Sequence, residues 1–110
     1  MENCVSSAAL DAARTRLDAA EAARETILLQ HIAGGVIIDS RTVQIAPDVQ
    51  IAPGAVILAG TILRGHTIIG AGCIIGPNTL IEDSIVDEGT TVNASQVYGS
   101  HLGPHNNIGP

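Results

Sequence analysis

IAPDVQIAPGAVILAGTILRGHTIIGAGCIIGPNTLI, residues 45–81, carries a large aliphatic residue at every sixth position. These aliphatics are Ile45, Ile51, Ile57, Leu63, Ile69, Ile75 and Ile81. A smaller residue stands two positions before each next aliphatic, in the series Val49, Ala55, Thr61, Thr67, Cys73 and Thr79. The fourth position of each six holds a residue type that tolerates a positive φ angle, in the series Asp48, Gly54, Gly60, His66, Gly72 and Asn78. The stretch therefore predicts a tight corner every six residues.

A period of six fits neither common template of secondary structure. An amphipathic helix needs apolar residues at a 3.6-residue spacing, and a hairpin needs an alternation that breaks at a short turn. A repeat of six with one large and one small inward residue is typical of a parallel β-helix, in which three short strands form one triangular coil and the coils stack. We therefore expect a mainly β fold, with one N-terminal α-helix in residues 1–35 and a β-helix of hexapeptide repeats in residues 36–110.

The repeat loosens on both sides of this stretch. Val36, Ile37 and Ile38 begin the coil, and the step from Ile38 to Ile45 is seven residues. After residue 81 the inward aliphatics follow at steps of five or six, at Val86, Val92, Val97, Leu102 and Ile108, and their small partners are Ser84, Thr90, Ser95 and Ser100. About four coils, the last one incomplete, fit this length. Full burial of each inward aliphatic contributes roughly 1.5–3 kcal/mol, so we expect the coils to be the stable unit.

Composition and charge restrict the class of protein. The chain is 45% hydrophobic but has one Tyr and no Phe or Trp, which suits the narrow interior of a triangular prism. A net charge of −6 with only five basic residues argues against a nucleic-acid partner. The only cysteines are Cys4 and Cys73, and Cys73 holds an inward position, so we expect no disulfide. No apolar run approaches the roughly 20 residues that cross a bilayer, and no signal peptide is recognisable. These features predict a soluble, cytoplasmic protein without a membrane partner.

The alanine-rich N-terminal segment predicts a long helix. Ser6 or Ser7 can cap it, it runs through His31, and Gly34-Gly35 ends it. One face carries a thin apolar stripe, made of Leu10, Ala13, Leu17, Ala20, Leu28 and His31. Such a stripe packs weakly on its own. We therefore expect the helix to lean on a neighbouring subunit or on something outside this chain.

Residues 24–110 resemble one family in particular. The phrases HIAGG followed by VIID, and CIIGPNTLIEDSIV with its five-residue steps, are similar to the bacterial bifunctional N-acetylglucosamine-1-phosphate uridyltransferase and glucosamine-1-phosphate acetyltransferase, at the junction of its two domains. The resemblance implies that residues 7–31 are the linker arm and that Val36 begins a left-handed β-helix. It further implies a homotrimer and a role in making UDP-N-acetylglucosamine for peptidoglycan precursors.

The resemblance does not bring the family's chemistry with it. The glycine-rich nucleotide-binding loop of the uridyltransferase half has no counterpart here, and Cys4-Val5-Ser6-Ser7 lacks the Gly and Asn of the family's metal-binding motif. The family's acetyltransferase residues lie in coils that would follow Pro110. We therefore expect a fragment that lacks both catalytic sites, with no cofactor, metal or small-molecule substrate of its own. In the family acetyl-CoA is a substrate, and magnesium belongs to the absent domain.

Four histidines remain as candidates for chemistry. His66 and His105 fall at corners, His101 precedes an inward leucine, and His31 lies near a helix end. Histidine is tolerated at each of these places for structural reasons. His101 and His105 are four residues apart, but a coil does not bring that spacing together as a helix does, so the spacing does not favour a metal site.

Two acidic pairs, Glu82-Asp83 and Asp87-Glu88, are the other candidates. We interpret both as solvated corners, because a role in general acid or base catalysis needs a cleft and a shifted pKa. We therefore assign no catalytic, cofactor-binding or metal residue.

Three functions stay open at this point. The first is an inactive segment of the bifunctional transferase that acts as a scaffold. The second is a stand-alone trimerisation module of hexapeptide coils. The third is a small acyl-CoA-dependent acyltransferase that works in the clefts between trimer subunits and uses His66 or His101.

Overall fold

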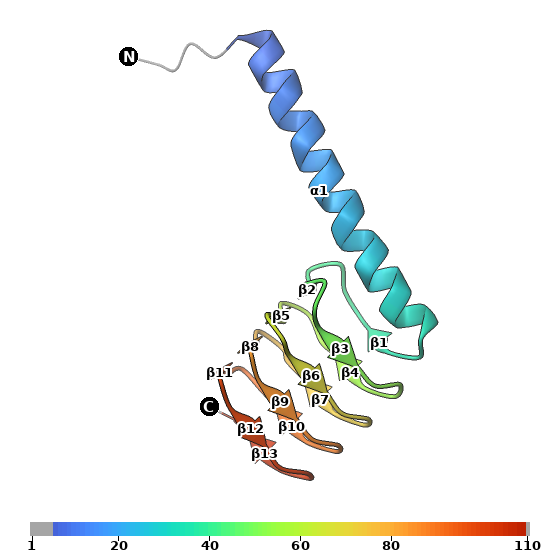
Figure 1. Ribbon diagram of the computed structural model, residues 1–110, viewed down its shortest axis with the longest axis vertical. Helices are drawn as coiled ribbons and strands as arrows, with labels where there is room; N and C mark the ends of the chain where they lie inside the picture. Colours follow the sequence, from blue (N-terminus) through green and yellow to red (C-terminus); the bar gives the residue numbers. More distant parts are fainter. Residues whose placement is uncertain (1–5, 110) are drawn as a thin grey trace.

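The computed structural model describes residues 6–109, which form a long helix followed by a stack of short strands (Figure 1). Helix α1 spans Ser7–Ala33 and the strands follow in sequence order. The first sheet contains β1 (Ile37–Ile38), β4 (Val56–Ile57), β7 (Ile74–Ile75), β10 (Thr91–Val92) and β13 (Asn107–Ile108). The second contains β2 (Gln44–Ile45), β5 (Ile62–Arg64), β8 (Leu80–Glu82) and β11 (Gln96–Tyr98). The third contains β3 (Gln50–Ile51), β6 (Ile68–Ile69), β9 (Ile85–Val86) and β12 (His101–Leu102).

Each strand from β1 to β10 pairs in parallel with the strand three places further along the chain. Leu63 pairs with Ile81, three repeats of six later, whereas Val92 pairs with Ile108 because two five-residue steps shorten that coil. Each coil thus contributes one strand to each of three sheets, which makes a triangular prism of about four coils. This confirms the predicted parallel β-helix of hexapeptide repeats. Its left-handed sense stays a prediction.

The interior of the prism is a column of the predicted aliphatics. Nine of the twelve are buried, and Ile57, Leu63, Ile75 and Ile81 have no exposed surface at all. Ile51, Leu102 and Ile108 are only half-buried. These three lie on β3, β12 and β13, each the last strand at one end of its sheet, so within residues 6–109 no further coil covers them. Ser95 and Ser100 are likewise less buried than the small inward residues before them.

The small polar residues that point inward all find partners. Thr67 Oγ1 donates to the Arg64 carbonyl at 2.8 Å, and Thr90 Oγ1 donates to the Gly103 carbonyl at 2.7 Å. Cys73 Sγ lies 3.0 Å from the Asp87 carbonyl, and burial raises the pKa of this thiol. Among the described residues no buried side-chain nitrogen or oxygen lacks a partner. The hydroxyls therefore add no desolvation penalty to the apolar column.

The corners follow the predicted period. Gly54, Gly60, Gly72 and Asn78 have positive φ angles, which their residue types tolerate. Asp48 and His66 stand at predicted corners without a positive φ angle. Both residues lie in turns, but Asp48 does not enter the left-handed region, and at the other corner the preceding Gly65 takes it with φ 69°. Glycine has no Cβ to collide with its own backbone, so at this corner Gly65 adopts the left-handed conformation and His66 does not.

Helix α1 begins and ends as predicted. The Ser6 hydroxyl caps it by accepting a hydrogen bond from the Ala9 amide at 3.1 Å, and Gly35, at φ 100°, ends it. The amide of Val36 closes the helix end by donating to the His31 carbonyl at 3.0 Å. The helix contacts only β1 and β2 extensively, and its N-terminal part points away from the stack (Figure 1). Within the described residues 6–109, no helix combines the length and apolarity needed to cross a bilayer.

Candidate functional sites

Parallel register places side chains from successive coils next to one another on the outside of the prism. His101 starts β12 and pairs in register with Ile85 on β9. Asp87 follows β9 directly, so its carboxylate lies beside the imidazole of the next coil. His101 Nε2 is 2.9 Å from Asp87 Oδ2 and 3.0 Å from Oδ1. The stacking of coils, and not closeness in sequence, builds this pair.

Asp87, but not His101, lines a shallow hollow together with Ile68, Ile85 and Pro104. A carboxylate that holds one imidazole nitrogen fixes the orientation of the ring, which is how general bases are positioned. The His101 side chain is 61% exposed and that of Asp87 is 36% exposed. Solvent therefore screens the pair, and as an ion pair it adds little to stability.

The other three histidines are placed separately. His66 is exposed, and its backbone amide donates to Asp83 Oδ1 at 2.9 Å. His105 has φ 55° and its ring lies over Gly89, where a Cβ would collide with it. His31 is half-buried near the helix end, and this burial lowers its pKa. Of the four histidines, only His101 has a carboxylate partner among the residues that the structure describes.

The acidic pairs are more specifically engaged than the interpretation as solvated corners suggested. Glu82 Oε1 accepts a hydrogen bond from Arg64 Nε at 2.6 Å across adjacent coils. Asp83 accepts a hydrogen bond from the His66 amide at the corner of the preceding coil, and the Asp87 carboxylate contacts the His101 imidazole. These contacts join residues 14 to 18 apart in sequence, which is close to one full coil. Counting one coil length along the sequence is the signal that would have found them.

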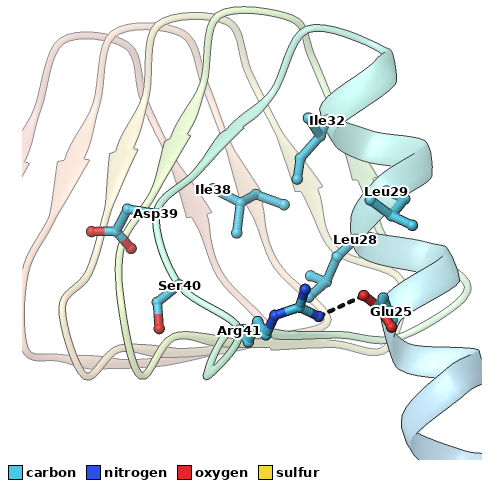
Figure 2. Close-up of a pocket in the computed structure, with 8 residues that line it drawn as sticks. All are labelled: Glu25, Leu28, Leu29, Ile32, Ile38, Asp39, Ser40 and Arg41. Carbon is cyan, nitrogen blue, oxygen red and sulfur yellow. Dashed lines mark hydrogen bonds and ion pairs between the residues drawn. The ribbon is translucent and has the colours of Figure 1, made fainter.

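A second pocket, of about 230 Å³, lies between the end of α1 and the first coil. Figure 2 shows its apolar side chains, with Leu28 and Ile32 from the helix and Ile38 from β1. At its rim Arg41 reaches Glu25 on the helix and forms an ion pair with it (Figure 2). Arg41, the cation among the described residues that line this pocket, is thus already paired with a carboxylate. The side chains around the pocket, which come from both α1 and the first coil, hold the helix against the prism.

Metal-binding geometry is absent from the described residues. Between residues 6 and 109 no three His, Cys, Asp or Glu side chains gather closely enough to hold an ion. Of the motif Cys4-Val5-Ser6-Ser7, the first two residues lie outside the described residues. The predictions that this segment has no cofactor and no assigned site residue stay predictions.

Among known protein families, one family model matches the central coils of the chain. Residues 48–83, from just before β3 to the end of β8, match the family model described as bacterial transferase hexapeptide (six repeats). The match covers the part of the chain where the six-residue period is regular. Curated proteins searched with this sequence gave no match.

Proposed function

We propose that this chain is the linker arm and the first coils of a bifunctional uridyltransferase–acetyltransferase of UDP-N-acetylglucosamine synthesis. The premise is that its central coils match the bacterial transferase hexapeptide model. In this role the segment is a scaffold and carries neither active site. One observation supports this most strongly. A long helix ends directly on the first coil of a hexapeptide prism, which is the arrangement that the sequence resemblance implies for the junction of the two domains.

The contacts of the junction suit a scaffold. Leu28 is buried against the first coil, Ile27 packs beside it, and the Arg41–Glu25 ion pair bridges helix and prism. The charged pairs on the prism likewise join one coil to the next, as Arg64–Glu82 does. The contacts between helix and prism fix the direction of the arm, and the pairs between coils hold the coils to one another.

Association as a homotrimer is part of this proposal. The outward positions of the first sheet form an apolar column of Ile37, Val56 and Ile74, and the third sheet adds Ile68 and Ile85. Ile37 is 57% exposed, and Ile68 and Ile74 are each 42% exposed. Contiguous exposed apolar surface favours burial against a partner. Three prisms packed side by side would cover these columns.

The test measures mass and activity on the same purified protein. Light scattering should give three times the mass of one chain, and incubation with glucosamine-1-phosphate and acetyl-CoA should release no free thiol. A full-length bifunctional transferase serves as the positive control. A monomer mass at high micromolar concentration would contradict the proposed trimer. Thiol release within about a hundredfold of the control would contradict the proposal of an inactive scaffold, because the loss of one acid or base alone costs about 10²–10⁴ in rate.

A second candidate, acyl transfer, is favoured by the His101–Asp87 pair and by the hollow that Asp87 lines. Here His101 would act as the base and Asp87 would orient it. If the protein releases thiol, His101→Ala and Asp87→Asn should each abolish the release, and the matched control His66→Ala should not. Loss in His66→Ala as well would exclude the oriented pair as the source of activity.

A further inference from the structure

The N-terminal part of α1 carries an apolar stripe that the described part of its own chain leaves uncovered. Leu10 is 52% exposed and Leu17 is 57% exposed, and the exposed Ala13 and Ala20 lie between and beyond them. Spacings of three, four and seven residues return to one side of a helix, so these four side chains share a face. Ile27 continues the same face, and there the prism covers it. The stripe is therefore continuous with an interface that the molecule already forms.

We propose that this stripe, made of Leu10, Ala13, Leu17 and Ala20, packs against the same stripe of neighbouring copies of the chain as a short parallel coiled coil, which is three-stranded in the proposed trimer. Leu10 and Leu17 are seven residues apart and fall at the a positions of a heptad. Ala13 and Ala20 then fall at the d positions. This inference rests on the proposed function, because the association of the prisms brings the second arm within reach.

Charges beside the stripe select the parallel arrangement. Arg16 precedes Leu17 and falls at a g position, and Glu21 follows Ala20 and falls at an e position. In a parallel coiled coil a g residue lies opposite the e residue five positions later on the other helix. Arg16 therefore faces the partner's Glu21, and symmetry repeats the contact. Among residues 6–109, neither Arg16 nor Glu21 makes an ion pair, so both are available.

The antiparallel arrangement meets repulsion instead. Setting Leu17 opposite Ala13 of the second copy brings Arg14 close to its own counterpart, and Arg16 close to its own counterpart. Like charges that face each other across a helix pair disfavour that pairing. Rotation about an axis along the arms, as in a ring of side-by-side prisms, also keeps the arms parallel and in register.

The stripe is too thin to drive association alone. It offers two leucines per arm, and alanine contributes little buried surface. Linked to prisms that already associate, the arms meet at an effective concentration on the order of millimolar instead of the micromolar concentration of free chains. The arms therefore pair within an assembly and do not create it.

Disulfide trapping tests the pairing and its direction. The background variant is Cys4→Ser, and the native Cys73 can remain because it is fully buried and burial raises its thiol pKa. Ala13→Cys and Ala20→Cys place thiols in the stripe. Ala12→Cys and Ala19→Cys are matched controls, because they substitute the neighbouring alanines on the outer side of the helix.

Parallel pairing predicts that Ala13→Cys and Ala20→Cys each form a disulfide with the same residue of another chain several-fold faster than the controls, because only the stripe positions face their counterparts across the coiled coil. Arg16→Glu should slow both reactions, and adding Glu21→Arg should restore them. Equal rates in stripe and control variants would overturn the pairing. A disulfide at only one of the two stripe positions would overturn the parallel register, since an antiparallel pair matches identical residues only at its centre.

The same reduced samples separate this inference from the proposed trimer. Light scattering that shows an oligomer without selective trapping overturns the pairing of the arms and leaves the trimer standing. A monomer mass without selective trapping overturns both. Selective trapping in an oligomer supports both.

Discussion

Ile75 in the prism and Leu17 in the helix are both large aliphatic residues, yet Ile75 is fully buried and Leu17 is 57% exposed. The difference extends to the whole of each region. The two inner coils of the prism, β4 to β6 and β7 to β9, bury an aliphatic from each of their three sides, whereas residues 6–26 are exposed without exception. The helix is held by its own backbone hydrogen bonds, its Ser6 cap and the high helix propensity of alanine. Burial therefore stabilises the prism, and local preference stabilises the arm.

This contrast predicts how the chain unfolds. A helix with little tertiary packing has low stability in water, because nucleation is unfavourable and most helical stability in proteins comes from packing of an apolar face. The arm should open and close many times while the prism stays folded. Only its last turns, where Leu28 is buried and Glu25 pairs with Arg41, share the stability of the coils.

The largest expected effect comes from a charge placed inside the prism. Ile75→Asp buries an unpaired carboxylate and should cost on the order of 4–5 kcal/mol or prevent folding. Ile74→Asp, on the same strand but 42% exposed, is the matched control and should stay within about 0.5 kcal/mol of the parent. Urea denaturation at a concentration where the chain is monomeric measures both. Equal midpoints for the two variants would contradict the assigned inward and outward faces of β7.

Exchanging glycine and alanine should have opposite consequences in the two regions. Gly60 has φ 75°, so Gly60→Ala forces a Cβ into the left-handed region and toward the Asn78 side chain, at a cost of about 1–2 kcal/mol. In the arm, Ala22→Gly lowers local helix stability by about 1 kcal/mol but leaves the prism intact. Circular dichroism should therefore show less helix for Ala22→Gly at an unchanged denaturation midpoint, and a lower midpoint for Gly60→Ala. A lower midpoint in Ala22→Gly would mean that arm and prism unfold together.

The smallest expected effect is a pH dependence confined to the junction. Burial lowers the pKa of His31 from its ordinary value of 6.5, so the undocked helix end binds a proton more readily than the docked one. Docking of the helix end should therefore be strongest above pH 6.5 and should weaken as the pH falls through and below that value. Amide exchange in residues 28–33, corrected for intrinsic rates, measures this at pH 7.5 and pH 5. His31→Gln should remove the pH dependence, and its persistence in that variant would assign it to another group.

The inward positions of the prism were predictable because each repeat carries its own signal. Ile57, Leu63 and Ile69 could be assigned without any knowledge of the neighbouring coil. The half-burial of Ile51 and Ile108 could not, because it depends on which strands lie at the ends of the stack. Ala94 adopts φ 47°, and alanine gives no turn signal, so that corner was invisible in the sequence.

The site residues were less predictable, because their contacts join different coils. His101 was recognised as a candidate, but its partner Asp87 follows from the register of β9 and β12. The Arg41–Glu25 pair depends on where α1 comes to rest on the first coil, which no local pattern specifies. The thin stripe of the helix did predict weak packing, and the exposure of Leu10 and Leu17 confirms that weakness within this chain.

Native-state hydrogen exchange tests the central claim most directly, namely that the prism carries the stability and the arm is ordered locally. A variant with Leu10→Glu and Leu17→Glu removes any protection from pairing of the arms. Amides in β4 to β9 should then exchange only through global unfolding, and amides in residues 10–22 should exchange through local opening at far lower free energy. Protection of residues 10–22 equal to that of β6 and β7 would contradict this account.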